Sequence, residues 1–261
     1  MTKPQKGRPR SHEKRGGAEG SRGGGEGSRP LGLPGAWTPA SAAAARKTDT
    51  FMARAAIVTI ALYGLYWAVT ALRHHHLGNY AVETDFYWNY GPAAAALKEG
   101  RVLIEHFDSK GWGYPLVVAA ISCLGLDLFK AGQVVGLLSA CAALGCVFRV
   151  HRLLLGSALA FLSVLLLAAN PTFLANTYEV GTDMFFFATA IGSIALLLGA
   201  ERPGWKALLG SGFLGGWAFA TRYNGLFLLP AAVIAIVALV DPARPAAARW
   251  RDAAVWSASF L

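Results

Sequence analysis

Two groups of acidic residues in this 261-residue chain have the type and setting for acid–base chemistry. The first is the run Glu83-Thr-Asp85, and the second is the run Glu179-Val-Gly-Thr-Asp183. A positioned carboxylate can take up or release a proton during a reaction. Carboxylates beside a membrane are costly to desolvate and are therefore typical of functional sites. Both groups are the leading candidates for functional residues.

Each acid also has a plainer structural interpretation. Asp85, or its neighbour Thr84, could cap the Ala-rich helix that is expected to end at Gly100. Asp183 could cap a helix that begins at Met184. From the residues alone, both interpretations stay open beside the functional one.

Further polar and aromatic residues accompany the acids. Arg222 suits bidentate contact with a phosphate, or it simply extends to the membrane interface. Asp108 lies in a turn shaped by Gly and Pro residues, and its contact with a substrate stays open. His74, His75 and His76 are consecutive and cannot share one face of a helix, which favours interfacial polarity over metal binding.

Aromatic side chains are dense in the same region. Such side chains stack on sugar rings or anchor a protein at the headgroup level, and these two interpretations are equally supported. The residues are Phe86, Tyr87, Trp88, Tyr90, Phe107, Trp112 and Tyr114.

The elements that would position these residues are membrane helices. Apolar residues make up 54% of the chain and charged residues 15%, with a mean hydropathy of +0.41. The apolar residues form blocks that reach or approach the roughly 20 residues needed to cross a bilayer. This composition argues against a water-soluble globule and predicts an all-α polytopic membrane protein. The expected spans are residues 52–72, 131–148, 153–169, 184–200, 207–220 and 226–240.

The N-terminal segment sets the expected orientation. Residues 1–50 are rich in Gly, Pro, Ser and Arg, which predicts a disordered basic tail. Residues 1–54 contain 11 Lys and Arg against 4 Asp and Glu, so the positive-inside rule places the tail in the cytoplasm. The polar segment 73–113 is then an external loop.

The apolar run 114–129 decides the rest of the topology. It is short, so we expect it to lie along the membrane or to re-enter it rather than cross it. The basic residues from Arg149 to Arg152 are then cytoplasmic, and residues 170–183 are external. If the run crossed, Asp183 would be inside. We adopt the first topology because it leaves every basic short loop except the Arg222 turn in the cytoplasm.

Five sequence elements, in order, resemble the bacterial branch of membrane glycosyltransferases with the C-type (GT-C) fold. This branch is related to protein O-mannosyltransferases and to the lipid A aminoarabinose transferase. The elements are an acid that starts a helix ending in Gly (Asp85 to Gly100), the run Gly111-Trp-Gly-Tyr-Pro115, the basic turn Arg149-Val-His-Arg152 before Leu-Leu-Leu-Gly156, the turn from Asn170 to Asp183, and Arg222-Tyr-Asn-Gly225. The resemblance covers roughly residues 52–240. The run Glu83-Thr-Asp85 replaces the adjacent Asp-Glu pair common in the family, and the distance to Gly100 favours Asp85 for the catalytic position.

The resemblance implies a GT-C-like helical module, residues 51–261, with a long first external loop that carries juxtamembrane helices. It implies transfer of a sugar from a polyprenyl-phosphate donor to a lipid, glycan or protein acceptor at the external face of the inner (plasma) membrane. Asp85 would be the catalytic base, and Asp183 would orient the acceptor or the base. Arg222 would hold the lipid phosphate. The further substrate-binding residues expected are Glu83, Tyr87 and Asp108.

Several points stay open on this interpretation. Asp183 could help to hold a divalent metal, as in oligosaccharide-transferring relatives, but two acids alone define no metal site, so no cofactor is assigned. The apolar opening of a further helix near Leu261 predicts that the module is a fragment. The alternative function is a non-enzymatic transporter or assembly subunit whose acids line a polar pathway. Acids at span ends and the lack of an internal repeat favour the transferase, and no nucleic-acid partner is expected.

Overall fold

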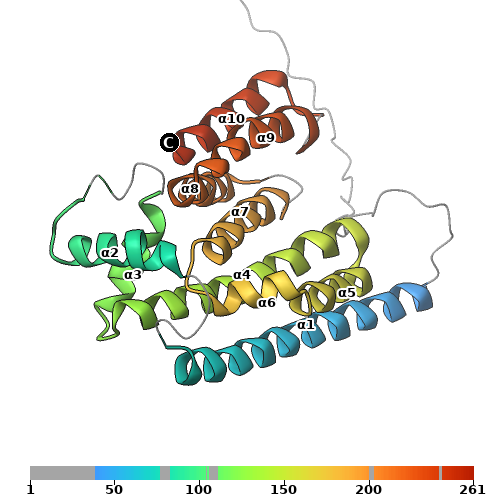
Figure 1. Cartoon of the computed structure of the whole chain (residues 1–261). Helices are drawn as coiled ribbons and strands as arrows, with labels where there is room; N and C mark the ends of the chain where they lie inside the picture. The colour runs from blue at the N-terminus through green and yellow to red at the C-terminus, as the bar shows by residue number, and fades with distance from the viewer. Residues whose placement is uncertain (1–38, 77–82, 104, 106–110, 200–202, 241–242) are drawn as a thin grey trace, which may run out of the picture. The chain divides into compact units, whose positions relative to one another are not determined.

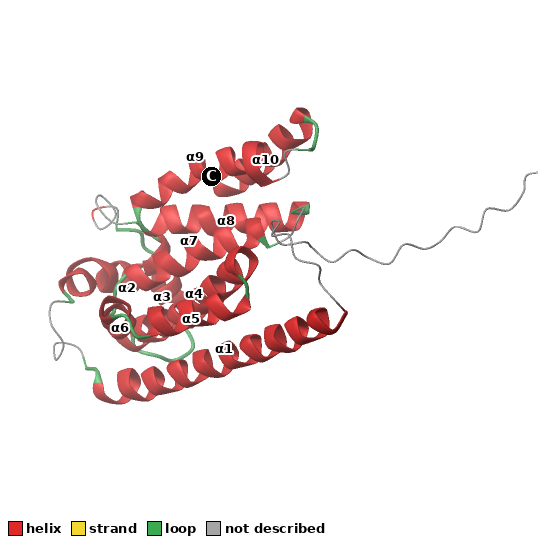
Figure 2. Ribbon diagram, turned by 90° about the vertical axis from the view of Figure 1, so that its right-hand side faces the viewer, coloured by secondary structure: helices red, strands yellow, loops and turns green. Residues whose placement is uncertain are grey.

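The computed structural model describes residues 39–261, apart from 77–82, 104, 106–110, 200–202 and 241–242. Within these residues every regular element is a helix (Figure 2), which confirms the predicted all-α membrane fold. The longer helices are α1 (Pro39–His74), α3 (Gly113–Ser122), α4 (Leu128–Leu155), α5 (Ser157–Ala168), α7 (Asp183–Leu198), α8 (Trp205–Thr221) and α10 (Ala246–Phe260). The shorter ones are η1 (Phe86–Tyr90), α2 (Gly91–Lys98), α6 (Pro171–Tyr178), η3 (Tyr223–Phe227), α9 (Leu228–Ile234) and η4 (Ala235–Val240).

The helices pack in a series. Helix α1 lies beside α4 and α5, α4 packs on α7, α7 on α8, and α8 on α10 (Figure 1). The outward side of α1 exposes large apolar residues, including Phe51, Ile57, Leu62 and Leu65. Such a surface belongs against lipid rather than water.

Helix α1 begins at Pro39, inside the segment predicted as a tail. The Ala-rich stretch that follows Pro39 has a strong helix propensity, and proline is well tolerated in a first helical turn. Residues 1–38 lie outside the described residues. The division of the chain at residue 50 therefore stays a prediction.

Among the described residues, two helices are long and apolar enough to cross a membrane by length and composition, Arg46–His74 and Leu128–Leu155. The pair α5 and α6 is bent by 62° and would make a third span if it counts as one. The expected spans 184–200, 207–220 and 226–240 fall on α7, on α8 and on the run η3 to η4. Six separate crossings stay a prediction.

Helix α3 has only 10 residues, as expected for a segment that does not cross. At 1.5 Å per residue it is about 15 Å long, roughly half of the hydrocarbon core. A turn with Gly125 at φ 91° follows it, and Asp127 then caps α4 by accepting a hydrogen bond from the Lys130 N–H at 2.8 Å.

Two predicted boundaries differ from the structure. The basic residues from Arg149 to Arg152 form the end of α4 instead of a turn, because the helix continues until Gly156, whose φ of 85° stops it. The segment 170–183, predicted as a turn, contains α6. Asn170 caps α6 by accepting a hydrogen bond from the Phe173 N–H at 3.1 Å, and Pro171 occupies the first helical position.

Polar contacts tie α7, α8 and α10 together in an otherwise apolar interior. Ser193 donates to the backbone carbonyl of Ser211 at 2.8 Å, and Ser211 donates to that of Ser193 at 2.7 Å. The indole N–H of Trp256 donates to the Ser211 hydroxyl at 2.8 Å. Because α7 and α8 are consecutive helices packed against each other, the start of α7 lies close to the end of α8. Residues of the candidate site lie at these two ends.

Candidate functional site

The first acidic run lies just before the short helix η1. Asp85 is exposed and does not make a side-chain capping bond to η1, so the structure does not support the capping interpretation for it. Glu83, two residues earlier, is 3% exposed. The two acids are therefore in opposite environments, and only Asp85 can meet a substrate without a change in structure.

The aromatic side chains of the region that the structure describes, all those named above except Phe107, divide into two groups. The buried group packs in one hydrophobic cluster and consists of Phe86, Tyr90 and Tyr114. The exposed group consists of Tyr87, Trp88 and Trp112. The buried group therefore serves to pack the fold. Neither sugar stacking nor membrane anchoring, the two interpretations from sequence, predicts this role. Tyr87 is 44% exposed and stays a candidate for substrate contact.

Glu179 joins the two acidic groups. It follows α6 and is half-buried, and burial raises the pKa of its carboxyl group, with further contributions from the negative charges of Asp183 and Asp85. These charges act on Glu179 only because the turn after α6 brings Asp85, Glu179 and Asp183 near one another. Asp85 of the first group thus lies close enough to the second group to act on Glu179.

One member of this acidic group, Asp183, forms an ion pair with an arginine. Asp183 is the first residue of α7, and its carboxylate pairs with the guanidinium of Arg222, which ends α8. Both side chains are partly exposed. The recorded bond uses one of the five N–H donors of the guanidinium. The Arg222 guanidinium is therefore accessible at the surface, and the Asp183 carboxylate orients it.

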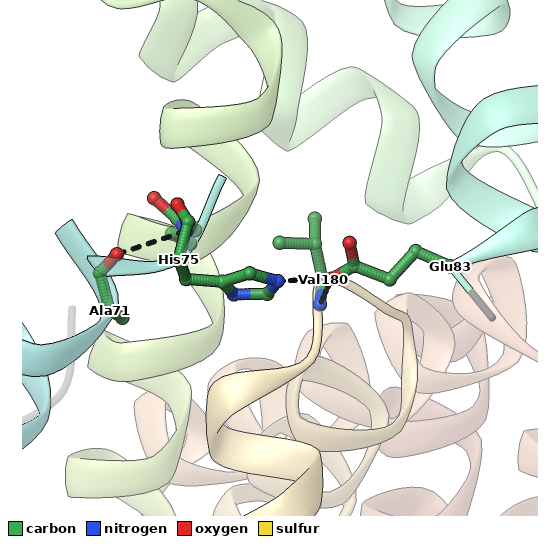
Figure 3. A network of polar contacts seen from close by, with 5 residues as sticks. Ala71, His75, Glu83 and Val180 are labelled. Carbon is green, nitrogen blue, oxygen red and sulfur yellow. Dashed lines mark hydrogen bonds and ion pairs between the residues drawn. The ribbon is translucent and has the colours of Figure 1, made fainter. Parts of the chain in front are cut away.

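Glu83 binds protein rather than facing solvent. Its carboxylate accepts a hydrogen bond from the Val180 N–H at 2.9 Å and lies 3.2 Å from Nε2 of His75 (Figure 3). Burial raises the pKa of Glu83 to about 7, against the lowering effect of the Val180 N–H. This placement differs from the predicted direct contact of Glu83 with substrate, since the side chain faces inward.

Other expectations have mixed outcomes. Asp108 lies outside the described residues. His75, interpreted from sequence as interfacial polarity, is 2% exposed and belongs to the Glu83 contacts. Glu83 is eight residues away, but the other partners of His75, which are Phe129, Gln133 and Tyr178, are far along the chain, so no local pattern could reveal its burial. Glu179 belongs to the second acidic group of the sequence, four residues before Asp183, but no role was assigned to it there.

Metal binding gains no support from the described side chains. Among them, no three His, Cys, Asp or Glu residues are arranged to hold a metal ion.

An apolar cavity of about 310 Å³ lies at the end of α8 that leads to Arg222. Its lining residues are Trp112, Phe213, Gly216, Trp217, Phe219, Ala220, Ser259, Phe260 and Leu261. The loop before α3 reaches this end of α8, and Trp112 packs edge-on against Trp217 with ring centroids 5.8 Å apart. A largely apolar surface thus adjoins the charged group.

Gly111 makes this approach of the loop to α8 feasible. A Cβ atom at this position would overlap the backbone carbonyl of Ala220 and crowd that of Thr221. We expect Gly111→Ala to destabilise the fold by about 1–3 kcal/mol, seen as a lower thermal unfolding temperature in detergent. Gly145→Ala is the matched control, because a Cβ there meets nothing within 4 Å. Equal unfolding temperatures for Gly111→Ala and the unaltered chain would contradict the close contact.

The helical membrane module, with acids and an arginine gathered at neighbouring helix ends, is that of a GT-C-type membrane glycosyltransferase. The chain belongs to the dolichyl-phosphate-mannose-protein mannosyltransferase family, whose sequence profile matches residues 110–259. No curated protein and no solved structure matches the chain. The matched segment contains Glu179, Asp183 and Arg222 and begins after Asp85.

Family membership confirms the resemblance drawn from the sequence. It supports a membrane glycosyltransferase that uses a lipid-linked sugar donor, and it disfavours the transporter alternative. The roles of individual residues rest on the geometry described above.

Proposed function

We propose that this protein transfers a sugar from a polyprenyl-phosphate carrier to an acceptor hydroxyl group at the external face of the plasma membrane, with its N-terminus in the cytoplasm. The observation that supports this most is the exposed carboxylate of Asp85 beside Glu179 and the Asp183–Arg222 pair. A base, a cation for phosphate and an adjoining apolar surface are the parts that this reaction requires.

Asp85 is the proposed general base. The acceptor oxygen forms a bond to the anomeric carbon, and the bond from that carbon to the phosphate oxygen breaks. The acceptor proton passes to Asp85, and the electron pair of the broken bond leaves on the phosphate. The leaving phosphate is a stable anion, so the reaction needs no strong general acid.

Arg222 is the proposed contact for the lipid phosphate. Its guanidinium is fixed by Asp183, which leaves less side-chain freedom to lose when the phosphate binds. The cavity at the end of α8 offers apolar contact for the first part of the lipid chain. Asp183 then acts through Arg222, a narrower role than orienting the acceptor directly.

The test is transfer from defined donors in membranes that contain the whole protein. Radiolabelled mannose, glucose and aminoarabinose, each linked to a polyprenyl phosphate, are supplied separately, and label in the acceptor fraction is measured. We expect one donor to give label above that of membranes lacking the protein. Absence of transfer from every donor, with the protein inserted at normal levels, would count against the proposal.

A further inference from the structure

The contact between His75 and Glu83 joins two residues that are eight positions apart in the chain and that both contact the end of α6. His75 follows the end of α1, and Glu83 precedes η1. Both side chains are buried, at 0% and 1% exposure, and Nε2 of His75 lies 3.2 Å from Oε1 of Glu83 (Figure 3). Burying two ionisable groups costs free energy unless they are paired, so a pair held this deep points to a role of its own.

The end of α1 is fixed by α4. The side-chain amide of Gln133 donates to the backbone carbonyls of Ala71, at 3.2 Å, and of His75, at 3.0 Å. The His75 ring also contacts the Phe129 ring edge-on, with centroids 5.1 Å apart. His75 is therefore held by groups that do not take part in the acidic site.

From this fixed position the pair reaches both neighbours of Glu179. The His75 ring stacks on Tyr178 with centroids 4.2 Å apart. On the other side, Glu83 accepts the Val180 N–H at 2.9 Å. Tyr178 and Val180 are the sequence neighbours of Glu179. The His75 and Glu83 contacts therefore hold the turn on both sides of Glu179.

We propose that His75 and Glu83 are positioning residues that clamp the turn carrying Glu179 and so hold the acids of the two groups together. The clamp spans the end of α1, the start of η1 and the end of α6. For its effect on catalysis, this inference rests on the proposed function. The clamp itself is a property of the fold and can be measured without sugar transfer.

The surroundings of Glu83 make the clamp sensitive to pH. The ionisable groups that face it are His75 at the end of α1, Glu179 after α6 and Tyr114 in α3, while α4 contributes the uncharged Gln133. Burial raises the pKa of Glu83 and lowers that of His75, because it disfavours the charged form of each group. Ionisation of Glu83 would add a negative charge beside Glu179.

The sign of the pH effect follows from the raised pKa. The pKa of Glu83 is about 7 in the folded protein, above its ordinary value of 4.5. Its contribution to stability is then fully present below about pH 4.5 and is lost as the pH rises through about 7.

The first test is thiol labelling of the clamped turn in the full chain, in membranes. Gly181→Cys places a reporter where a Cβ meets nothing within 4 Å, and Cys123→Ser removes the exposed native thiol. We expect Glu83→Ala to increase the labelling rate about tenfold, since loss of a buried hydrogen bond raises the open fraction of a turn by roughly that factor. Glu83→Gln keeps an acceptor for the Val180 N–H and should leave the rate unchanged.

Glu99→Ala is the matched control, because Glu99 is an exposed acid that pairs with Arg101 and makes no recorded contact with the Glu179 turn. Its labelling rate should equal that of the parent. Equal rates for Glu83→Ala and the parent would overturn the clamp.

The second test keeps the inference falsifiable if Glu83→Ala does not fold. The unfolding temperature of the parent should fall as the pH rises through about 7, and this fall should be smaller in Glu83→Gln. An identical pH dependence in both proteins would overturn the clamp. Because neither readout requires a donor, a lack of sugar transfer in the parent would count against the proposed function alone.

Discussion

Asp85→Asn is expected to lower sugar transfer by about 10²- to 10⁴-fold, the range typical for loss of a general base. The amide has nearly the shape of the carboxylate but cannot accept the acceptor's proton at neutral pH. The side chain is exposed and makes no capping bond, so the fold should not change. The measurement is the initial rate of label transfer from the active donor, at equal amounts of inserted protein.

The same assay with Glu99→Gln provides the control. Glu99 ends the segment that begins with Asp85, is exposed and pairs with Arg101, so its loss should leave transfer within about twofold of the unaltered protein. If Asp85→Asn also kept nearly full transfer, the base would have to lie elsewhere. Glu179, near Asp85 and Asp183, would be the next residue to replace.

Arg222→Gln is expected to weaken the use of the lipid-phosphate donor by about 10- to 150-fold in kcat/KM. The charge-assisted bonds from a guanidinium to a phosphate are worth about 1.5–3 kcal/mol, and glutamine cannot replace them. Because the contact is proposed with the phosphate rather than the acceptor, the change should appear in the donor dependence of the rate. Titration of donor at fixed acceptor measures it.

The paired variant Asp183→Arg with Arg222→Asp separates donor binding from the ion pair. Exchanging the two charges can restore the contact between the ends of α7 and α8, but it moves the arginine to a different helix end. Stability should therefore recover relative to Arg222→Asp alone, and donor use should not. Recovery of both would mean that Arg222 serves only the ion pair.

The sequence predicted the fold class and marked the two acidic groups as candidate functional residues, for physical reasons. Apolar blocks specify membrane helices regardless of their partners, and charges placed at helix ends must lie near the membrane surface. The Asp183 and Arg222 positions follow directly, because consecutive packed helices bring the start of one near the end of the next.

The internal contacts of the site could not be predicted in the same way. Glu83 meets Val180 across 97 residues, and Gln133 meets His75 across 58, so no local pattern encodes either pair. The predicted end of α4 was wrong for a different reason. The charge of the α4 arginines favours a turn, yet arginine is a good helix former, and the helix stops only at Gly156.

The reciprocal serine bonds between α7 and α8 fix the vertical register of the two helices. A slip of one helical turn would move α8 by about 5.4 Å along its axis, which would break both Ser193–Ser211 bonds and the Trp256 bond together. It would also carry Arg222 away from Asp183 and change its depth relative to the bilayer. Small polar groups in the middle of the module thus set the level at which the charged pair meets the membrane surface.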